Sequence, residues 1–425
     1  MDIELLISER MADWGRRLNF PSEAVEALQA VAGLVREEVE LHSIFAEFHD
    51  RTALRGEWHR EWSDLPVDPR VQARLGERTS LFYLLAYMAA LPYTEAKYRQ
   101  LGVGMDIFDD TMKDFLNYLG DFYDLRGYWG YALFAWIWRH LTCELFRLGR
   151  LQYMLAPFHG GVTAFRRKFR VDRRSQKPAR AGTFSRDLAL TGQNADGDLS
   201  GLDIILLADP DQPLRADGYA YGAGQFQRDD GTMPAESWKP VFEASTAGWR
   251  GHIVNPYGFV HSHVVFLPCS EWEMILQLGN TVLDLHIPRK DPLTAETCRA
   301  SLQQALEFYP RVFPEHPWKA LYCHTWFFTP QLQTFLPPKS SIVKFQREFY
   351  LYPFPGNIGF LWSFVFGEKH PEPAVAPRDT SLRRAVLDWI GQGKEIFDLP
   401  GIMFHTPEEW GTQPYMGQWD ARKTR

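Results

Sequence analysis

Two histidines each lie in an apolar run that is predicted to form a β-strand. His286 belongs to the run Thr281–Ile287, and His324 belongs to Lys319–Phe328. An imidazole titrates close to neutral pH, so either side chain could take up or release a proton during a reaction. The alternative is a hydrogen-bonded core histidine beside Trp326. These two residues are the first candidates for general acid–base chemistry.

A second pair of histidines suits a metal ion. His261 and His263 are two residues apart in the run Phe259–Phe266, so a strand would place both imidazoles on one face, as in some β-barrel metal sites. The third ligand stays open among His252, His286 and Glu271. Two ligands do not make a site, so no metal is predicted, and a metal-dependent enzyme is kept as an alternative.

The elements before residue 160 are predicted to be helices. Apolar residues spaced alternately four and three apart form one helix face, at Phe108, Met112, Phe115, Leu119 and Phe122. No proline interrupts the chain from Tyr131 to Met154, and this predicts one further helix. We therefore expect a helical N-terminal domain over residues 1–160.

A basic segment follows, and it is predicted as a linker or loop over residues 161–200. Nine Lys or Arg residues lie between Phe165 and Arg186, against a single Asp172. One interpretation is a solvated connection between domains. The other is a cradle, Arg166 to Arg186, for an anionic partner such as the phosphates of a donor or an acidic carrier protein.

Residues 201–425 are predicted to form a second domain that contains sheets. Short β-favouring runs alternate with turn clusters and predict antiparallel strands at Asp203–Ala208, Val241–Glu243, Phe259–Leu267 and Met274–Leu285. The strands that contain His286 and His324 flank a helix that begins near Thr294, whose hydroxyl can cap it. Further on we expect a helix broken by Pro337-Pro338, a hairpin of Phe349–Phe354 with Gly359–Gly367, and a last helix Thr380–Ile390.

The composition excludes several classes of protein. The chain has 425 residues, of which 45% are hydrophobic and 23% charged, and its net charge of −7 argues against general affinity for nucleic acids. Its longest apolar stretches, such as Leu81–Tyr93, are shorter than the roughly 18 residues that span a bilayer. The first residues resemble no export signal, and the four cysteines form no CxxC pair. A cytoplasmic protein without a membrane span is expected.

Several motifs resemble one family when their order is considered. They are LGRLQY at Leu148–Tyr153, LHIP at Leu285–Pro288, EFYPRVFP at Glu307–Pro314, HTWFFTPQL at His324–Leu332 and SSI at Ser340–Ile342. Together they resemble bacterial acyltransferases with a helical N-terminal domain and a GNAT-like (N-acetyltransferase-like) C-terminal domain. The resemblance implies an α+β fold: an N-terminal helical domain followed by a GNAT-like mixed α/β sheet domain.

The resemblance also implies where an acyl donor binds. Two adjacent parallel strands, Thr281–Ile287 and Lys319–Phe328, would splay apart and admit the pantetheine arm of the donor. Phosphates would lie near the helix that begins at Thr294, because helix N-termini favour anions. The usual glycine-rich loop is absent, so Arg289 and Lys290 would help to hold acyl-CoA, or the donor would be the acyl-phosphopantetheine of an acyl carrier protein.

Acyl transfer needs a base, an oxyanion site and an acid for the leaving thiolate. His324 and His286 are the candidate bases, with a slight preference for His324. Ser341 could protonate the sulfur or could simply cap a helix, and Tyr322 is the other candidate acid. Asp284 is interpreted as a fold contact rather than as the partner of His286.

The function expected from the sequence is transfer of an acyl group from a thioester donor, acyl-CoA or acyl carrier protein, to an amine or hydroxyl of a small-molecule acceptor. N-acylation is the favoured form. The alternatives are a non-catalytic GNAT-like binding protein and a metal-dependent enzyme that uses His261 and His263.

Overall fold

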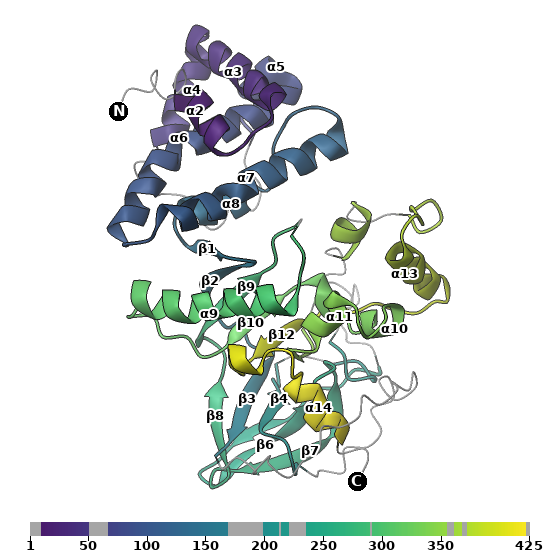
Figure 1. Ribbon diagram of the computed structural model, residues 1–425. Coiled ribbons are helices and arrows are strands. Elements are labelled where there is room, and N and C mark those ends of the chain that lie inside the picture. The colour runs from purple at the N-terminus through teal and green to yellow at the C-terminus, as the bar shows by residue number, and fades with distance from the viewer. Residues whose placement is uncertain are drawn as a thin grey trace. The chain divides into compact units, whose positions relative to one another are not determined.

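The computed structural model describes residues 10–50, 67–168, 199–211, 214–220, 235–289, 291–354, 361–367 and 372–421. The chain forms two compact units (Figure 1). Unit 1 contains Met1–Met154, Ile287–Asp291 and Gln304–Pro314, and unit 2 contains Leu155–His286, Pro292–Gln303 and Glu315–Arg425. The chain therefore leaves unit 1 after Met154 and returns to it twice, in two short segments.

Unit 1 is built mainly of helices. They are α2 (Arg10–Arg17), α3 (Ser22–Glu37), α4 (Val39–His49), α5 (Pro69–Leu75), the short η2 (Gly76–Arg78), α6 (Thr79–Gln100), α7 (Met105–Arg126) and α8 (Phe134–Leu141). Every residue of α6 from Leu81 to Leu91 is buried, so this apolar stretch is a core helix. None of the described helices is long and apolar enough to cross a bilayer.

The continuous helix predicted from Tyr131 to Met154 is wrong. Only α8 is helical, and the chain then forms an antiparallel hairpin of β1 (Leu145–Leu148) and β2 (Leu151–Pro157). Cys143, two residues after the end of α8, has φ +59°, outside the right-handed region, and Gly149 has φ +67°. Gly149 lies in the two-residue connection between the strands, where such an angle suits glycine.

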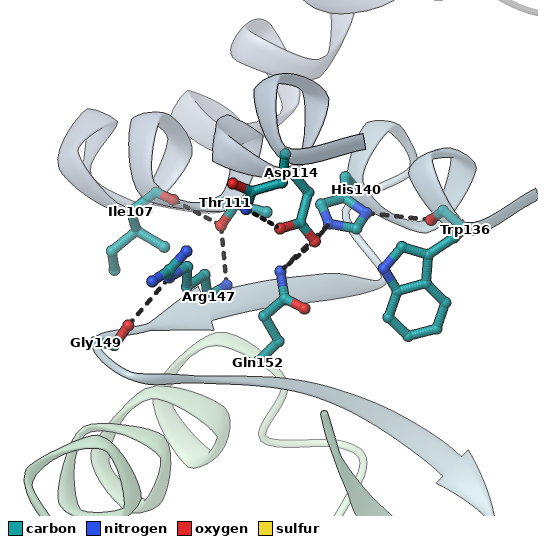
Figure 2. Close-up of polar contacts among 9 residues, drawn as sticks. Ile107, Thr111, Asp114, Trp136, His140, Arg147, Gly149 and Gln152 are labelled. Atoms are coloured by element: carbon teal, nitrogen blue, oxygen red, sulfur yellow. Dashed lines mark hydrogen bonds and ion pairs between the residues drawn. The ribbon is translucent and has the colours of Figure 1, made fainter. Parts of the chain in front are cut away.

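A buried polar network joins this hairpin to α7 and α8 (Figure 2). The Asp114 carboxylate accepts a hydrogen bond from Gln152 Nε2 at 2.8 Å, and its Oδ2 lies 3.1 Å from His140 Nε2. His140 Nδ1 donates to the Trp136 carbonyl at 3.1 Å. Thr111 Oγ1 accepts from the backbone N–H of Arg147 at 2.9 Å. The network anchors the hairpin to the helices.

The LGRLQY motif meets the end of the LHIP motif inside unit 1. Arg150 donates from its guanidinium to the Pro288 carbonyl at 2.9 Å, and Arg147 forms an ion pair with Asp291. Both arginines are buried. These contacts give Arg147, Arg150 and Pro288 a role in the fold, because they fasten the returning segment Ile287–Asp291 to the hairpin.

Unit 2 contains an antiparallel sheet, as the alternation of short β-favouring runs with turn clusters predicts. Its strands are β3 (Val162–Arg167), β4 (Ile204–Ala208), β5 (Phe242–Ala244), β6 (Gly248–Val254), β7 (Val260–Pro268) and β8 (Trp272–Leu276), drawn from blue to teal in Figure 1. The order is β5-β6-β4-β3-β8, with β7 also paired to β6.

Four strands of unit 2 belong to a second, mixed sheet and follow the order β9-β10-β12-β11 in it. They are β9 (Thr281–His286), β10 (Leu321–His324), β12 (Pro400–Met403) and β11 (Tyr350–Leu351). Strand β10 runs parallel to β9 and antiparallel to β12. The helices near it are α9 (Ala295–Val312), η4 (Trp326–Phe328), α10 (Leu332–Phe335), α11 (Ser341–Gln346), η5 (Trp362–Phe366), α13 (Ser381–Gly391), η6 (Pro407–Glu409) and α14 (Pro414–Ala421).

The two sheets of unit 2 share one core. Val282 of β9, Ala320, Tyr322 of β10 and Ile402 of β12 pack in the same cluster as residues of the antiparallel sheet such as Leu206. The face of β9 and β10 that carries even-numbered residues therefore looks toward the antiparallel sheet.

Three predictions about elements in this region need correction. The strand Lys319–Phe328 is shorter, because the chain turns into η4 after His324. The hairpin with Gly359–Gly367 is wrong, since Trp362–Phe366 forms a π-helix, and residues 355–360 lie outside the described part. Leu361, Trp362, Val365 and Phe366 are all buried, and that spacing places them on one helix face against α13. Thr380–Ile390 is helical but not last, because β12 and α14 follow.

Candidate active site

The pairing between β9 and β10 stops before both histidines. The paired positions are Leu321 with Leu283 and Tyr322 with Asp284, while both strands continue for two more residues. On its other side β10 stays paired to β12 through His324 opposite Pro400. The sheet therefore loses its parallel ladder at the carboxyl ends of β9 and β10, as the splayed-strand prediction requires.

Four polar side chains share the face of these strand ends. Because Tyr322 pairs with Asp284 and side chains alternate along a strand, His286 and His324 project from the same face as that pair. The His286 and His324 side chains are 22% and 23% exposed. These four side chains therefore lie on the face of β9 and β10 that, nearer the start of each strand, packs into the core between the two sheets.

His324 lies beside a buried carboxylate. Its Nε2 is 3.6 Å from Oδ2 of Asp398, whose side chain is 1% exposed, and its ring packs edge-on against Phe354 at a centroid distance of 6.0 Å. Burial lowers the pKa of His324, and the charge of Asp284 partly opposes this. A neutral imidazole at neutral pH is the form that can accept a proton.

His286 lies beside Asp284, contrary to the expectation that Asp284 is only a fold contact. The distance from His286 Nε2 to Asp284 Oδ2 is 3.3 Å. Residues two apart on a strand share a face, so the contact follows directly from β9 geometry. The strand ends thus carry two histidine–carboxylate pairs.

Tyr322 and Cys323 hold their protons tightly at this site. Burial raises the pKa of Tyr322, with a further contribution from Asp284, and its hydroxyl hydrogen-bonds to Tyr352. Burial and the carboxylates of Asp284 and Asp398 raise the pKa of the Cys323 thiol well above its usual value. Cys323 is therefore no thiolate nucleophile, whereas Tyr322 stays a candidate proton donor.

Ser341 is the first residue of α11 and is exposed, and Ser340 occupies the N-cap position. The structure brings His286, His324 and Tyr322 together but records no contact of Ser341 with them. Its proposed role in protonating sulfur stays a prediction.

The residues predicted to bind donor phosphates have separate surroundings. Arg289 donates to Asp121 Oδ2 at 3.0 Å, and Lys290 lies outside the described residues. Thr294 caps α9 as predicted, because its Oγ1 accepts the N–H of Thr297 at 3.2 Å. Donor binding by these residues remains a proposal.

Most of the basic segment also lies outside the described residues, which stop at Lys168 and resume at Leu199. Arg166 is exposed, Arg167 pairs with Glu271 at 3.0 Å, and Lys168 donates to the Cys269 carbonyl at 2.6 Å. Arg166 and Arg167 line a pocket together with His405 and Tyr415.

His261 and His263 lie on β7 with their ring centroids 5.6 Å apart. Asn255 Nδ2 donates to His261 Nε2 at 3.2 Å, and the His261 carbonyl accepts from His252 Nδ1 at 3.1 Å. Among the described residues no three His, Cys, Asp or Glu side chains are grouped so that they could hold a metal. These contacts are those of structural histidines.

Sequence reasoning missed Asp398. It is the only charged residue in the apolar stretch Ile396–Phe404, and an isolated acid in such a stretch is a signal that could have found it. Because Asp398 is far from His324 along the chain, the sequence alone did not indicate that the two side chains are neighbours.

Two family models match the chain. Residues 145–403 match the model of the GNAT-like C-terminal domain, and residues 9–143 match the N-acyltransferase N-terminal domain. The chain belongs to the GNAT-like acyltransferase family. It is an acyltransferase enzyme, and the α+β architecture expected from the sequence is confirmed.

Solved structures share the fold of this acyltransferase. A mutant acyltransferase in complex with octanoyl-CoA is 18% identical with a TM-score of 0.57, covering 93% of this chain and 88% of that one. An acyltransferase with CoA and 10C-teicoplanin gives the same values. Another, with decanoyl-CoA and teicoplanin, is 18% identical with a TM-score of 0.56, covering 92% and 86%. No curated protein matches the chain significantly.

Proposed function

We propose that this acyltransferase moves an acyl group from acyl-CoA to the amine of a small-molecule acceptor, with His324 as the general base. The observation that carries the proposal is the end of the β9–β10 pairing at Tyr322 and Asp284, directly before His286 and His324. Such an opening leaves backbone groups available to a pantetheine arm and places titratable side chains beside it.

The donor is proposed from two lines of support. The family transfers acyl groups, and similar folds have been solved with octanoyl-CoA and decanoyl-CoA. Arg289, Lys290 and the N-terminus of α9 at Thr294 supply cations and N–H groups suited to phosphates. An acyl carrier protein would present the same pantetheine arm, and the basic segment from Arg166 to Arg186 would then face its acidic surface.

The acceptor is proposed to be a small molecule with an amine, or second a hydroxyl. Similar folds solved with teicoplanin support a small-molecule acceptor rather than a protein. The net charge of −7 argues against nucleic acid, and the cytoplasm is the proposed compartment because it supplies acyl-CoA.

The proposed steps keep atoms and charge balanced. The nitrogen of the acceptor amine attacks the thioester carbonyl and forms the C–N bond, while His324 takes the proton that this nitrogen loses. The tetrahedral intermediate then breaks its C–S bond, and Tyr322 or Ser341 gives a proton to the departing thiolate. His286, paired with Asp284, is assigned to shaping the site.

The test measures release of free thiol from acyl-CoA of varied chain length with a panel of small amines. His324→Ala is expected to lower kcat by about 10²- to 10⁴-fold and to remove the acidic limb of the pH–rate profile, as loss of a general base does. His286→Ala is the matched control and is expected to lose less.

Full activity of His324→Ala with an unchanged circular dichroism spectrum would reject the assignment of the base. If the wild-type protein showed neither a thermal shift with acyl-CoA nor thiol release, the donor proposal would fail, and acyl carrier protein would be tested next. Metal analysis of the purified protein tests the alternative enzyme that uses His261 and His263.

A further inference from the structure

Asp398 has surroundings that fold stability alone does not explain. Its side chain is 1% exposed, and neither carboxylate oxygen accepts a hydrogen bond within the described part of the chain. Its recorded charge partner is His324, whose Nε2 lies 3.6 Å from Oδ2. A buried carboxylate without hydrogen bonds is costly, and replacing it with an apolar residue would relieve that cost.

The fold holds this carboxylate at the imidazole. His324 pairs with Pro400 across the β10–β12 ladder, and Asp398 precedes Pro400 by two residues. The chain entering β12 thus brings the two side chains next to each other, with His324 Nε2 3.6 Å from Asp398 Oδ2. The neighbouring β12 residue Gly401 is closely packed, since a Cβ there would lie within 2.9 Å of Phe328 and Phe349 atoms.

We propose that Asp398 is a positioning residue for His324, which orients the ring and stabilises the imidazolium formed when it takes the acceptor's proton. The inference rests on the proposed function, in which His324 is the base. With Nε2–H directed at Asp398, Nδ1 is the nitrogen that accepts the proton, and the positive charge then faces the carboxylate. No other reactant is needed.

Other titratable groups lie near His324 and Asp398. Asp284 and His286 lie on β9, Tyr322 and Cys323 lie on β10, and Tyr352 bonds to Tyr322. Asp284 raises the pKa of His324, which is the direction in which an ionised Asp398 at 3.6 Å would also act. A variant of Asp284 is therefore unsuitable as a neutral control.

The experiment measures His324 itself as well as catalysis. Histidine proton resonances of the full-length protein are titrated by NMR, with the His324 signal assigned by its loss in His324→Gln. Because burial raises the pKa of Asp398 into the range in which His324 titrates, the two groups exchange protons as a coupled pair, and Asp398→Asn is expected to replace that coupled titration by a single step of His324 at lower pH. The acidic limb of kcat/KM should move to lower pH with it, and kcat should fall by up to about 10⁴-fold, as when the carboxylate that orients a catalytic histidine is replaced by an amide.

Two further variants keep the test decisive. Asp398→Glu keeps the charge and should restore part of the pKa and of kcat, and it is also the variant to use if Asp398→Asn does not fold. Asp388→Asn removes a carboxylate that is 60% exposed on α13 and should change neither readout.

An unchanged His324 titration in Asp398→Asn, or a fall in kcat without a shift of the acidic limb, would overturn the inference and leave Asp398 a merely structural role. Failure of the proposed function has a different signature. In that case His324→Gln keeps full activity, or no acyl transfer occurs, while the NMR titration still reports whether Asp398 controls the imidazole.

Discussion

At the scale of the residue, Asp398 should cost the protein stability in a pH-dependent manner. Burial raises its pKa from 3.8 to about 7 in the folded chain. The folded state therefore favours the protonated form, and this advantage is complete below pH about 4 and is lost as pH rises toward 7. From pH 4 to 8 the loss amounts to about 4 kcal/mol at most, by linkage.

Asp398→Asn does not titrate, so its free energy of unfolding relative to wild type should increase as pH rises. Chemical denaturation at pH 4, 6 and 8 measures this, with Asp388→Asn as the exposed control. Parallel pH curves for Asp398→Asn and wild type would contradict the prediction. A buried carboxylate that lowers stability is what a site retained for chemistry is expected to show.

At the scale of the element, the β1–β2 hairpin depends on one glycine. Gly149 has φ +67°, which an L-residue adopts only at a cost of about 1–2 kcal/mol. Gly149→Ala should therefore lower the free energy of unfolding by about that amount. Gly33→Ala is the matched control: it lies inside α3 with open space around its Cβ position, and it should gain about 0.5–1 kcal/mol.

Urea denaturation of both glycine variants measures the pair of effects. Equal changes of the same sign would show that the hairpin turn does not require glycine.

The β1–β2 hairpin also explains why the helix predicted from Tyr131 to Met154 was wrong. Residues of β1 are buried on both faces, so the run lacks the alternation that marks a strand and imitates a buried helix.

At the scale of the whole molecule, unit 1 is not continuous in sequence. Phe146 packs against Phe308 and Phe313 at centroid distances of 4.9 and 5.9 Å, and Tyr309 donates its hydroxyl to the Tyr153 carbonyl. These partners belong to the returning segment Gln304–Pro314. A fragment that ends at residue 154 would expose Phe146 and lose this contact.

We expect residues 1–154 alone to melt at a lower temperature and less cooperatively than unit 1 does within the full chain. Thermal unfolding followed by circular dichroism checks this, with Phe308→Ala in the full chain as the parallel perturbation, at a cost of about 3–5 kcal/mol. A fragment that melts cooperatively at the full-chain temperature would show that unit 1 needs no returning segment.

The sequence by itself determined those features that depend on neighbours along the chain. Apolar runs located β9 and β10 and thus placed His286 and His324 near strand ends, and the hydroxyl of Thr294 marked the start of α9. The order of motifs indicated the family. These signals are local, because periodicity and capping involve residues within a few positions of one another.

Only the tertiary structure decided which side chains meet. The β10–β12 register brings Asp398 to His324, and the return of Ile287–Asp291 to unit 1 gives Arg150 the Pro288 carbonyl. Trp362–Phe366 became a π-helix because its apolar side chains pack against α13, although its composition favours strands. Pairing between distant segments depends on the burial of the whole core, and no local pattern in the sequence encodes it.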